Sequence, residues 1–208
     1  MTSLSHAEGA ARDRAAASLP PLSLIAFSFF LPFVAECGQT IDSPRHFIAQ
    51  YPQPLFAAWV APAFIGAALL ALGTALVLLR PALIVYWPVA AIATALSLAG
   101  NLVWLGCAAA EALRTRLPGT RWERCYSLWS IAAIVIGSAL CTEALRCRGF
   151  VRWSRLIASY AVFASPHCYM LIDAGRAAIG LGGWCYASAD FVLIALPLCW
   201  PLFPRKQR

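Results

Sequence analysis

Residues 56–79 read FAAWVAPAFIGAALLALGTALVLL, a run with no charged residue and with Thr74 as its only hydroxyl-bearing side chain. A helix needs about 20 consecutive, mostly apolar residues to cross a bilayer, so this run predicts a membrane span. Arg80 and Pro81 follow it directly, and proline cannot continue the hydrogen-bond ladder of a helix. Because the next apolar run begins at once, the two runs predict a tight antiparallel helical hairpin.

The composition extends this pattern to the whole chain. Of 208 residues, 61% are hydrophobic and only 12% are charged, and the mean hydropathy is +0.71. A soluble domain usually carries about 25% charged and about 45–50% apolar residues. Such a chain has too few polar side chains to cover its surface in water. The composition therefore indicates an integral membrane protein.

Six apolar blocks predict an all-α fold, a polytopic transmembrane bundle of about six helices. Residues 1–19 are expected to form a flexible cytoplasmic tail, residues 20–204 the bundle and residues 205–208 a basic cytoplasmic tail. The first block could instead be a signal peptide, but Glu36 directly before Cys37 argues against processing and favours a retained helix. The expected spans cover residues of about 21–36, 56–79, 82–107, 126–145, 156–173 and 184–203.

The charge distribution predicts the orientation. The chain has 16 basic and 9 acidic residues, a formal net charge of +7. The arginines lie between the apolar blocks, which favours the anionic surface of a bilayer over nucleic acid as their partner. With the N-terminus inside, ten basic residues fall in inner segments and six in outer ones, although the loop 108–125 runs against this bias. Both termini are thus expected in the cytoplasm, and the alanine- and arginine-rich composition suggests a bacterial inner membrane.

Three polar residues fall at one expected depth in the outer half of the membrane. Asn101, His167 and Asp190 each lie six residues from the expected outer end of a different span, which is roughly 9 Å along a helix. Such groups are costly in lipid unless they are paired or hydrated. Two interpretations stay open: His167 and Asp190 satisfy each other as interhelical contacts, or all three line a polar pocket open to the outside. Pro166 also frees the carbonyl of Val162 to accept another donor.

The eight cysteines contain no CxxC pair, so neither zinc-site spacing nor a small disulfide scaffold is present. Most are expected to pack as small apolar residues. Cys107 and Cys125 bracket an expected outer loop, and they form the pair predicted to make a disulfide if that face is oxidising.

No motif predicts catalysis. The sequence contains no GxSxG or HExxH motif and no phosphate-binding loop, and it has only three histidines. We therefore expect no catalytic residue, no metal and no cofactor. The expected partners are the lipid bilayer, other membrane proteins or a second copy of the chain, with no nucleic acid.

Three classes of function remain open from the sequence. The first is a non-enzymatic accessory, assembly or protective factor that acts through membrane partners. The alternative is a small transporter or channel subunit that uses Asn101, His167 and Asp190. The third is a membrane thiol oxidoreductase.

Overall fold

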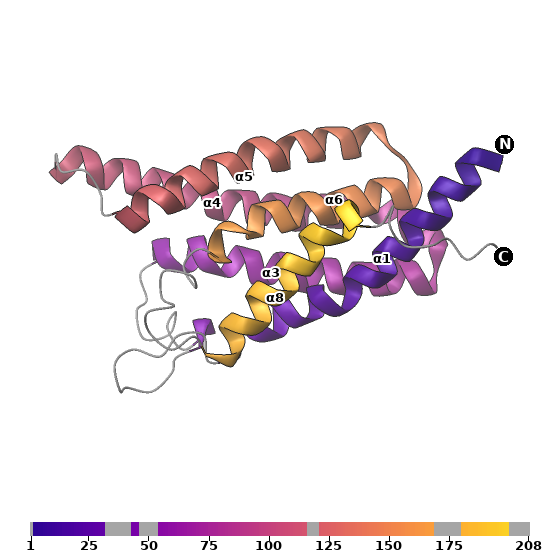
Figure 1. Ribbon diagram of the computed structural model, residues 1–208, viewed down its shortest axis with the longest axis horizontal. Coiled ribbons are helices and arrows are strands. Elements are labelled where there is room, and N and C mark those ends of the chain that lie inside the picture. Colours follow the sequence, from indigo (N-terminus) through magenta and orange to yellow (C-terminus); the bar gives the residue numbers. More distant parts are fainter. Residues whose placement is uncertain (1, 32–42, 46–53, 116–120, 169–179, 200–208) are drawn as a thin grey trace.

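The fold is all-helical. A computed structural model describes residues 2–31, 43–45, 54–115, 121–168 and 180–199, and these ranges contain six α-helices and no strand. A 3₁₀ helix, η1 (Pro81–Tyr86), leads into the third of them. The α-helices are α1 (Thr2–Ser28), α3 (Pro54–Leu79), α4 (Trp87–Thr115), α5 (Arg121–Arg146), α6 (Gly149–Ala164) and α8 (Leu181–Cys199) (Figure 1).

Three helical stretches are long and apolar enough to cross a membrane: Val60–Leu79, Pro81–Arg114 and Arg124–Arg146. Leu181–Pro197 is a shorter apolar helix. Large apolar side chains are exposed on five helices. Such exposed apolar surface is more stable in contact with lipid hydrocarbon than with water. These features indicate a membrane protein. Examples of the exposed side chains are Phe27, Leu72, Ile92, Val135 and Phe191.

The expected hairpin between the second and third apolar blocks is confirmed. Helix α3 ends at Leu79, and Arg80 alone separates it from η1. The Arg80 amide donates to the carbonyl of Leu76 (2.9 Å), while the Arg80 carbonyl accepts from the Leu83 amide (2.9 Å). Helices α3 and α4 then pack against each other.

Helix α6 begins earlier than the expected span of 156–173. Helix α5 ends at Arg146 and α6 begins at Gly149, so two residues replace the longer basic connector. Gly149 makes this short turn with a φ of 57°, which favours glycine. A Cβ atom there would overlap the carboxylate of Glu8, which accepts a hydrogen bond from the Phe150 amide (2.6 Å). The turn is therefore determined by a contact from a distant helix.

Residues 2–19, which were expected to belong to a flexible tail, are instead part of α1. Ala11 and Ala15 are buried, and the Arg12 guanidinium lies 5.9 Å from the centroid of the Phe150 ring. The Glu8 carboxylate meets the unpaired amides at the start of α6, where the helix dipole favours negative charge. These contacts explain why a polar, alanine-rich segment is ordered against the bundle.

Gly66 lies where three helices approach one another closely. A Cβ atom on this residue of α3 would lie 2.7 Å from the carbonyl oxygen of Ala93 in α4 and 3.0 Å from the Tyr160 ring in α6. Small residues permit such approaches in lipid, where packing drives the association of helices.

We predict that Gly66→Ala lowers the free energy of unfolding by about 1–3 kcal/mol, because the added methyl group overpacks the contact with Ala93. The matched control is Gly106→Ala, since a Cβ atom at Gly106 of α4 meets no neighbour within 4 Å. The control should be neutral or slightly stabilising, because alanine is the better helix former. Thermal unfolding of both variants in the same detergent measures the difference, and equal melting temperatures would contradict the close approach.

Candidate functional site

Helix α6 lies in the middle of the bundle and contacts each of the other helices (Figure 1). Side-chain hydrogen bonds join it to these neighbours. In lipid no water competes for such bonds, so they position the surrounding helices relative to α6. Along its length the bonds are Arg14 Nε to Ser154 Oγ (3.3 Å), Trp153 Nε1 to Thr74 Oγ1 (3.0 Å), Thr94 Oγ1 to the Leu156 carbonyl (3.2 Å), Ser159 Oγ to the Gly137 carbonyl (2.6 Å) and Tyr160 Oη to the Ala63 carbonyl (2.7 Å).

Side chains from α4 and α8, together with Ser165 directly after α6, donate hydrogen bonds to the last carbonyls of α6. Pro166 has no amide hydrogen, so the Val162 carbonyl loses its helical partner. The expectation that this carbonyl accepts another donor is confirmed. The three bonds to successive carbonyls are Ser165 Oγ to Val162 (2.8 Å), Asn101 Nδ2 to Phe163 (2.7 Å) and Tyr186 Oη to Ala164 (3.0 Å).

Asn101 connects α4 to α6 in a defined register. Its buried amide nitrogen donates both to Phe163 and, within its own helix, to the Ser97 carbonyl (3.1 Å). A second bond, from Thr94 to Leu156, lies two helical turns before the bond from Asn101 to Phe163. In both bonds the two partners are 62 residues apart in the sequence. The two helices therefore run in parallel at one constant offset. The Asn101 Oδ1 atom has no hydrogen-bond partner among the described residues.

Asp190 is only 1% exposed and forms a hydrogen bond with Cys168. Its Oδ2 atom accepts from the Cys168 thiol at 3.4 Å, and its Oδ1 atom has no hydrogen-bond partner in the described part of the chain. In one of the two interpretations left open by the sequence, His167 was the hydrogen-bond partner of Asp190. After the break at Pro166 the chain makes a short helical turn, and successive side chains in such a turn point about 100° apart. The residue directed at Asp190 for hydrogen bonding is therefore Cys168.

His167 lies within an aromatic row that crosses the bundle. Its buried ring has centroid distances of 6.3 Å to Tyr126 in α5 and 6.2 Å to Tyr186 in α8. The sequence analysis missed this row, because it joins single residues from four helices with one residue just after α1 and one just after α6, and no local pattern reveals it. The remaining centroid distances in the row are Phe29 to Phe64, 5.2 Å; Phe64 to Tyr186, 5.4 Å; and Tyr126 to Trp104, 4.8 Å.

The predicted outer loop 108–125 is mostly helical, since α4 continues to Thr115 and α5 starts at Arg121. Cys107 and Cys125 thus lie within helices rather than at the ends of a loop. Both are partly buried free thiols, so the predicted disulfide is not formed in the structure.

The candidate site is therefore a buried polar layer around the C-terminal end of α6. It contains Asn101, His167 and Asp190 from the sequence analysis, and it adds Cys168, whose role had no sequence signal. No group of three metal-ligating side chains within the described ranges could hold a metal ion. Comparison of the chain with protein-family models, curated proteins and solved structures gave no match.

We predict that Tyr186→Phe lowers the free energy of unfolding by about 1 kcal/mol, because the Ala164 carbonyl loses its donor. Tyr86→Phe is the matched control, since Tyr86 is 62% exposed and its change should have an effect within about 0.5 kcal/mol. Parallel thermal unfolding in detergent provides the measurement. An equal effect of both changes would show that the bond to α6 contributes nothing.

Proposed function

We propose that the chain is a non-enzymatic membrane protein that acts through contacts with other membrane proteins, as an accessory, assembly or protective factor. The observation that carries this proposal is that polar side chains in the interior form hydrogen bonds between helices. Asn101, Tyr186 and Ser159 bond to backbone carbonyls of other helices, and Trp153 bonds to Thr74. Side chains engaged in this way hold helices together, which leaves the outer surface for functional contacts.

Within this proposal the chain crosses the inner membrane of a bacterium six times, with both termini in the cytoplasm. Helix α6 has 16 residues, or about 24 Å, which is short for a bilayer core of about 30 Å. Its enclosure by the other helices supports its role as one of the six segments, because a helix surrounded by protein need not match the lipid thickness.

The arginines support the proposed orientation. Arg152, at the start of α6, donates to the Cys147 carbonyl (2.7 Å) and lies 4.4 Å from the centroid of the Trp87 ring. Arg155 pairs with Glu143 near the end of α5. Arg12 and Arg14 of α1 reach the same end of α6 through Phe150 and Ser154. A concentration of arginine at one end is typical of the cytoplasmic side, and tryptophan is typical of either membrane interface.

Reporter fusions test the orientation. Alkaline phosphatase fused after Arg208 should be inactive, and a fluorescent protein at the same position should fluoresce. Phosphatase fused at Pro118, between α4 and α5, should be active as the control. An active phosphatase after Arg208 would rule out the proposed inside C-terminus.

A transporter or channel subunit is the second candidate, and the two buried acceptors support it. The Oδ1 atoms of Asn101 and Asp190 have no hydrogen-bond partner in the described ranges. A buried acceptor in this state costs free energy, and binding of water or a cation would relieve that cost. In this alternative, Asp190 exchanges a proton or an ion during transport.

Asp190→Asn separates the two candidates. If the protein acts through partners, the variant should lose only about 1 kcal/mol of stability, because the amide oxygen still accepts from Cys168. Any loss of function should then be proportional to the decrease in the amount of protein in the membrane. Membrane abundance, melting temperature and the phenotype of a deletion strain are measured together. Asp13→Asn, at an exposed position of α1, is the control. Complete loss of function at normal abundance and melting temperature would overturn the proposal in favour of transport.

A further inference from the structure

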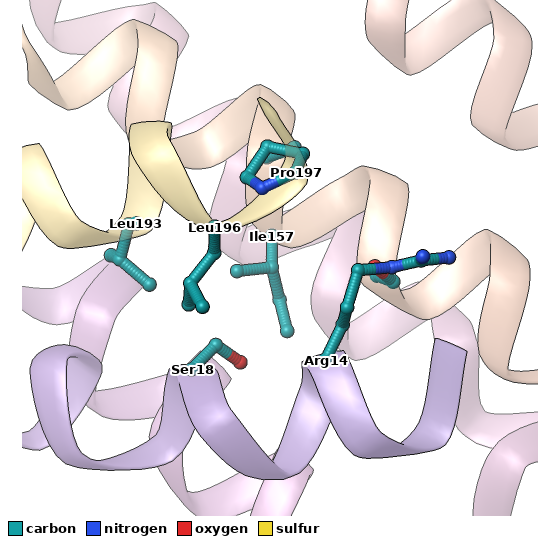
Figure 2. Close-up of a pocket in the computed structure, with 8 residues that line it drawn as sticks. Arg14, Ser18, Ile157, Leu193, Leu196 and Pro197 are labelled. Carbon is teal, nitrogen blue, oxygen red and sulfur yellow. The ribbon is translucent and has the colours of Figure 1, made fainter. Parts of the chain in front are cut away.

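The interior of the bundle has little room for a ligand. The cavity between α1, α6 and α8 that Figure 2 shows has a volume of about 20 Å³, which admits roughly one water molecule. Several interior polar side chains are already bonded to neighbouring helices. The outer surface is therefore the place for a contact with another molecule, and α4 has a continuous exposed side.

One side of α4 is exposed from its second turn to its last. The exposed residues recur every three or four positions, so they lie on one face of the helix. Gly106 lies at an open point of this face, because an added Cβ atom there would meet no neighbour within 4 Å. The face, which we call the α4 face, consists of Ile92, Ala95, Ala99, Leu102, Gly106, Ala110 and Leu113.

Lipid hydrocarbon can cover only the first part of the α4 face. Helix α4 has 29 residues, or about 44 Å, whereas the bilayer core is about 30 Å thick. With Trp87 at one interface, the helix leaves the hydrocarbon about 20 residues later, near Gly106. Leu113 lies about 10 Å farther out, and it is 81% exposed. Figure 1 shows this end of α4 extending past the neighbouring ends of α3 and α6. Exposed apolar surface outside the hydrocarbon is typical of a protein contact.

The charges near this end of α4 are mostly positive. Residues 108–125 contain four arginines and two glutamates. Glu111 and Arg114 pair with each other at 3.0 Å. Arg124 of α5 is exposed and forms no ion pair within the described ranges. An unpaired cation beside an exposed apolar face favours a partner that supplies carboxylates.

Arg124 lies beside the outer part of the α4 face. Trp104 Nε1 donates to Ser127 Oγ (3.3 Å), and Arg124 lies about one turn beyond Ser127, near the level at which α4 leaves the hydrocarbon. Arginine is favoured on the cytoplasmic side, so its excess at the opposite end calls for carboxylates from another molecule. A second copy of the chain would bring a further net positive charge here, which disfavours self-association.

We infer that the α4 face binds a helix of a different membrane protein, and that this partner carries carboxylates near the level of Arg124. The small side chains at Gly106 and Ala110 let the partner's backbone approach closely. Leu102 and Leu113 pack beside it, and the carboxylates pair with Arg124. The inference rests on the proposed function, since it names the surface through which the chain would contact its partner.

Site-directed photocross-linking of the full chain in native membranes tests the inference. A photoreactive phenylalanine derivative replaces Leu102, Leu113 or, as the control, Val135 of α5, which is 64% exposed. Irradiation should join positions 102 and 113 to the same second protein, whereas position 135 should face lipid and give little protein product. Mass spectrometry of the joined fragments should place carboxylates of that protein within about two helical turns of its attachment to position 113.

Two variants test the packing and the charge. Gly106→Leu should lower the cross-linking yield at position 113 about tenfold, because the larger side chain holds the helices apart. Its matched control is Ala139→Leu, at an exposed position of α5. Arg124→Gln should lower the yield about threefold, as expected for the loss of an exposed ion pair. Its control is Arg148→Gln, at an exposed position on the opposite end of the bundle. Both controls should cross-link like the wild type.

Four results would overturn the inference. They are the absence of a protein product at positions 102 and 113, a product made of two copies of the chain, a joined fragment without nearby carboxylates, and an unchanged yield in Gly106→Leu. If Gly106→Leu does not fold, the comparison of the three positions and the Arg124→Gln variant still decide the outcome. A product at position 135 alone would overturn the role of the α4 face and leave the proposed function in place, which Asp190→Asn tests separately.

Discussion

The hydrogen bonds formed by helix α6 are the interactions on which the rest of the bundle depends. Each of the other five described α-helices is joined to α6 or to its C-terminal cap by at least one side-chain hydrogen bond. In lipid, apolar surface alone provides little reason for one helix to choose another, so close packing and interhelical bonds decide the arrangement. The bond between Trp153 and Thr74 and that between Tyr160 and Ala63 are two examples, and both are buried.

The two ends of α6 are capped by opposite kinds of group, a hydrogen-bond acceptor at the N-terminus and donors at the C-terminus. At the N-terminus, where amides lack helical partners, the Glu8 carboxylate accepts from Phe150. At the C-terminus, where carbonyls lack partners, Asn101 and Tyr186 donate. Both arrangements suit the direction of the helix dipole. These bonds engage the side chains in holding helices together, and this is why the main functional proposal concerns the outer surface of the bundle.

The candidate site could be predicted only in part from the sequence. The depth of Asn101, His167 and Asp190 follows from their distance to the ends of apolar runs, and all three are buried. The donor to Asp190 could not be predicted, because it depends on the rotation of each helix about its own axis. The break at Pro166 was visible in the sequence, but the direction of the chain after it, which brings Cys168 to Asp190, was not.

The sequence by itself determined the helical class, the three helices that are long and apolar enough to cross a membrane, and the hairpin at Arg80 and Pro81. These features depend on local chemistry, because a backbone in lipid must satisfy its own hydrogen bonds and proline cannot. Only the tertiary structure decided that α6 starts at Gly149 and that the first residues of α1 are ordered. Both depend on the bond from Phe150 to Glu8, which joins positions 142 residues apart. Such a contact leaves no periodic pattern in the chain, since it exists only after the helices have packed.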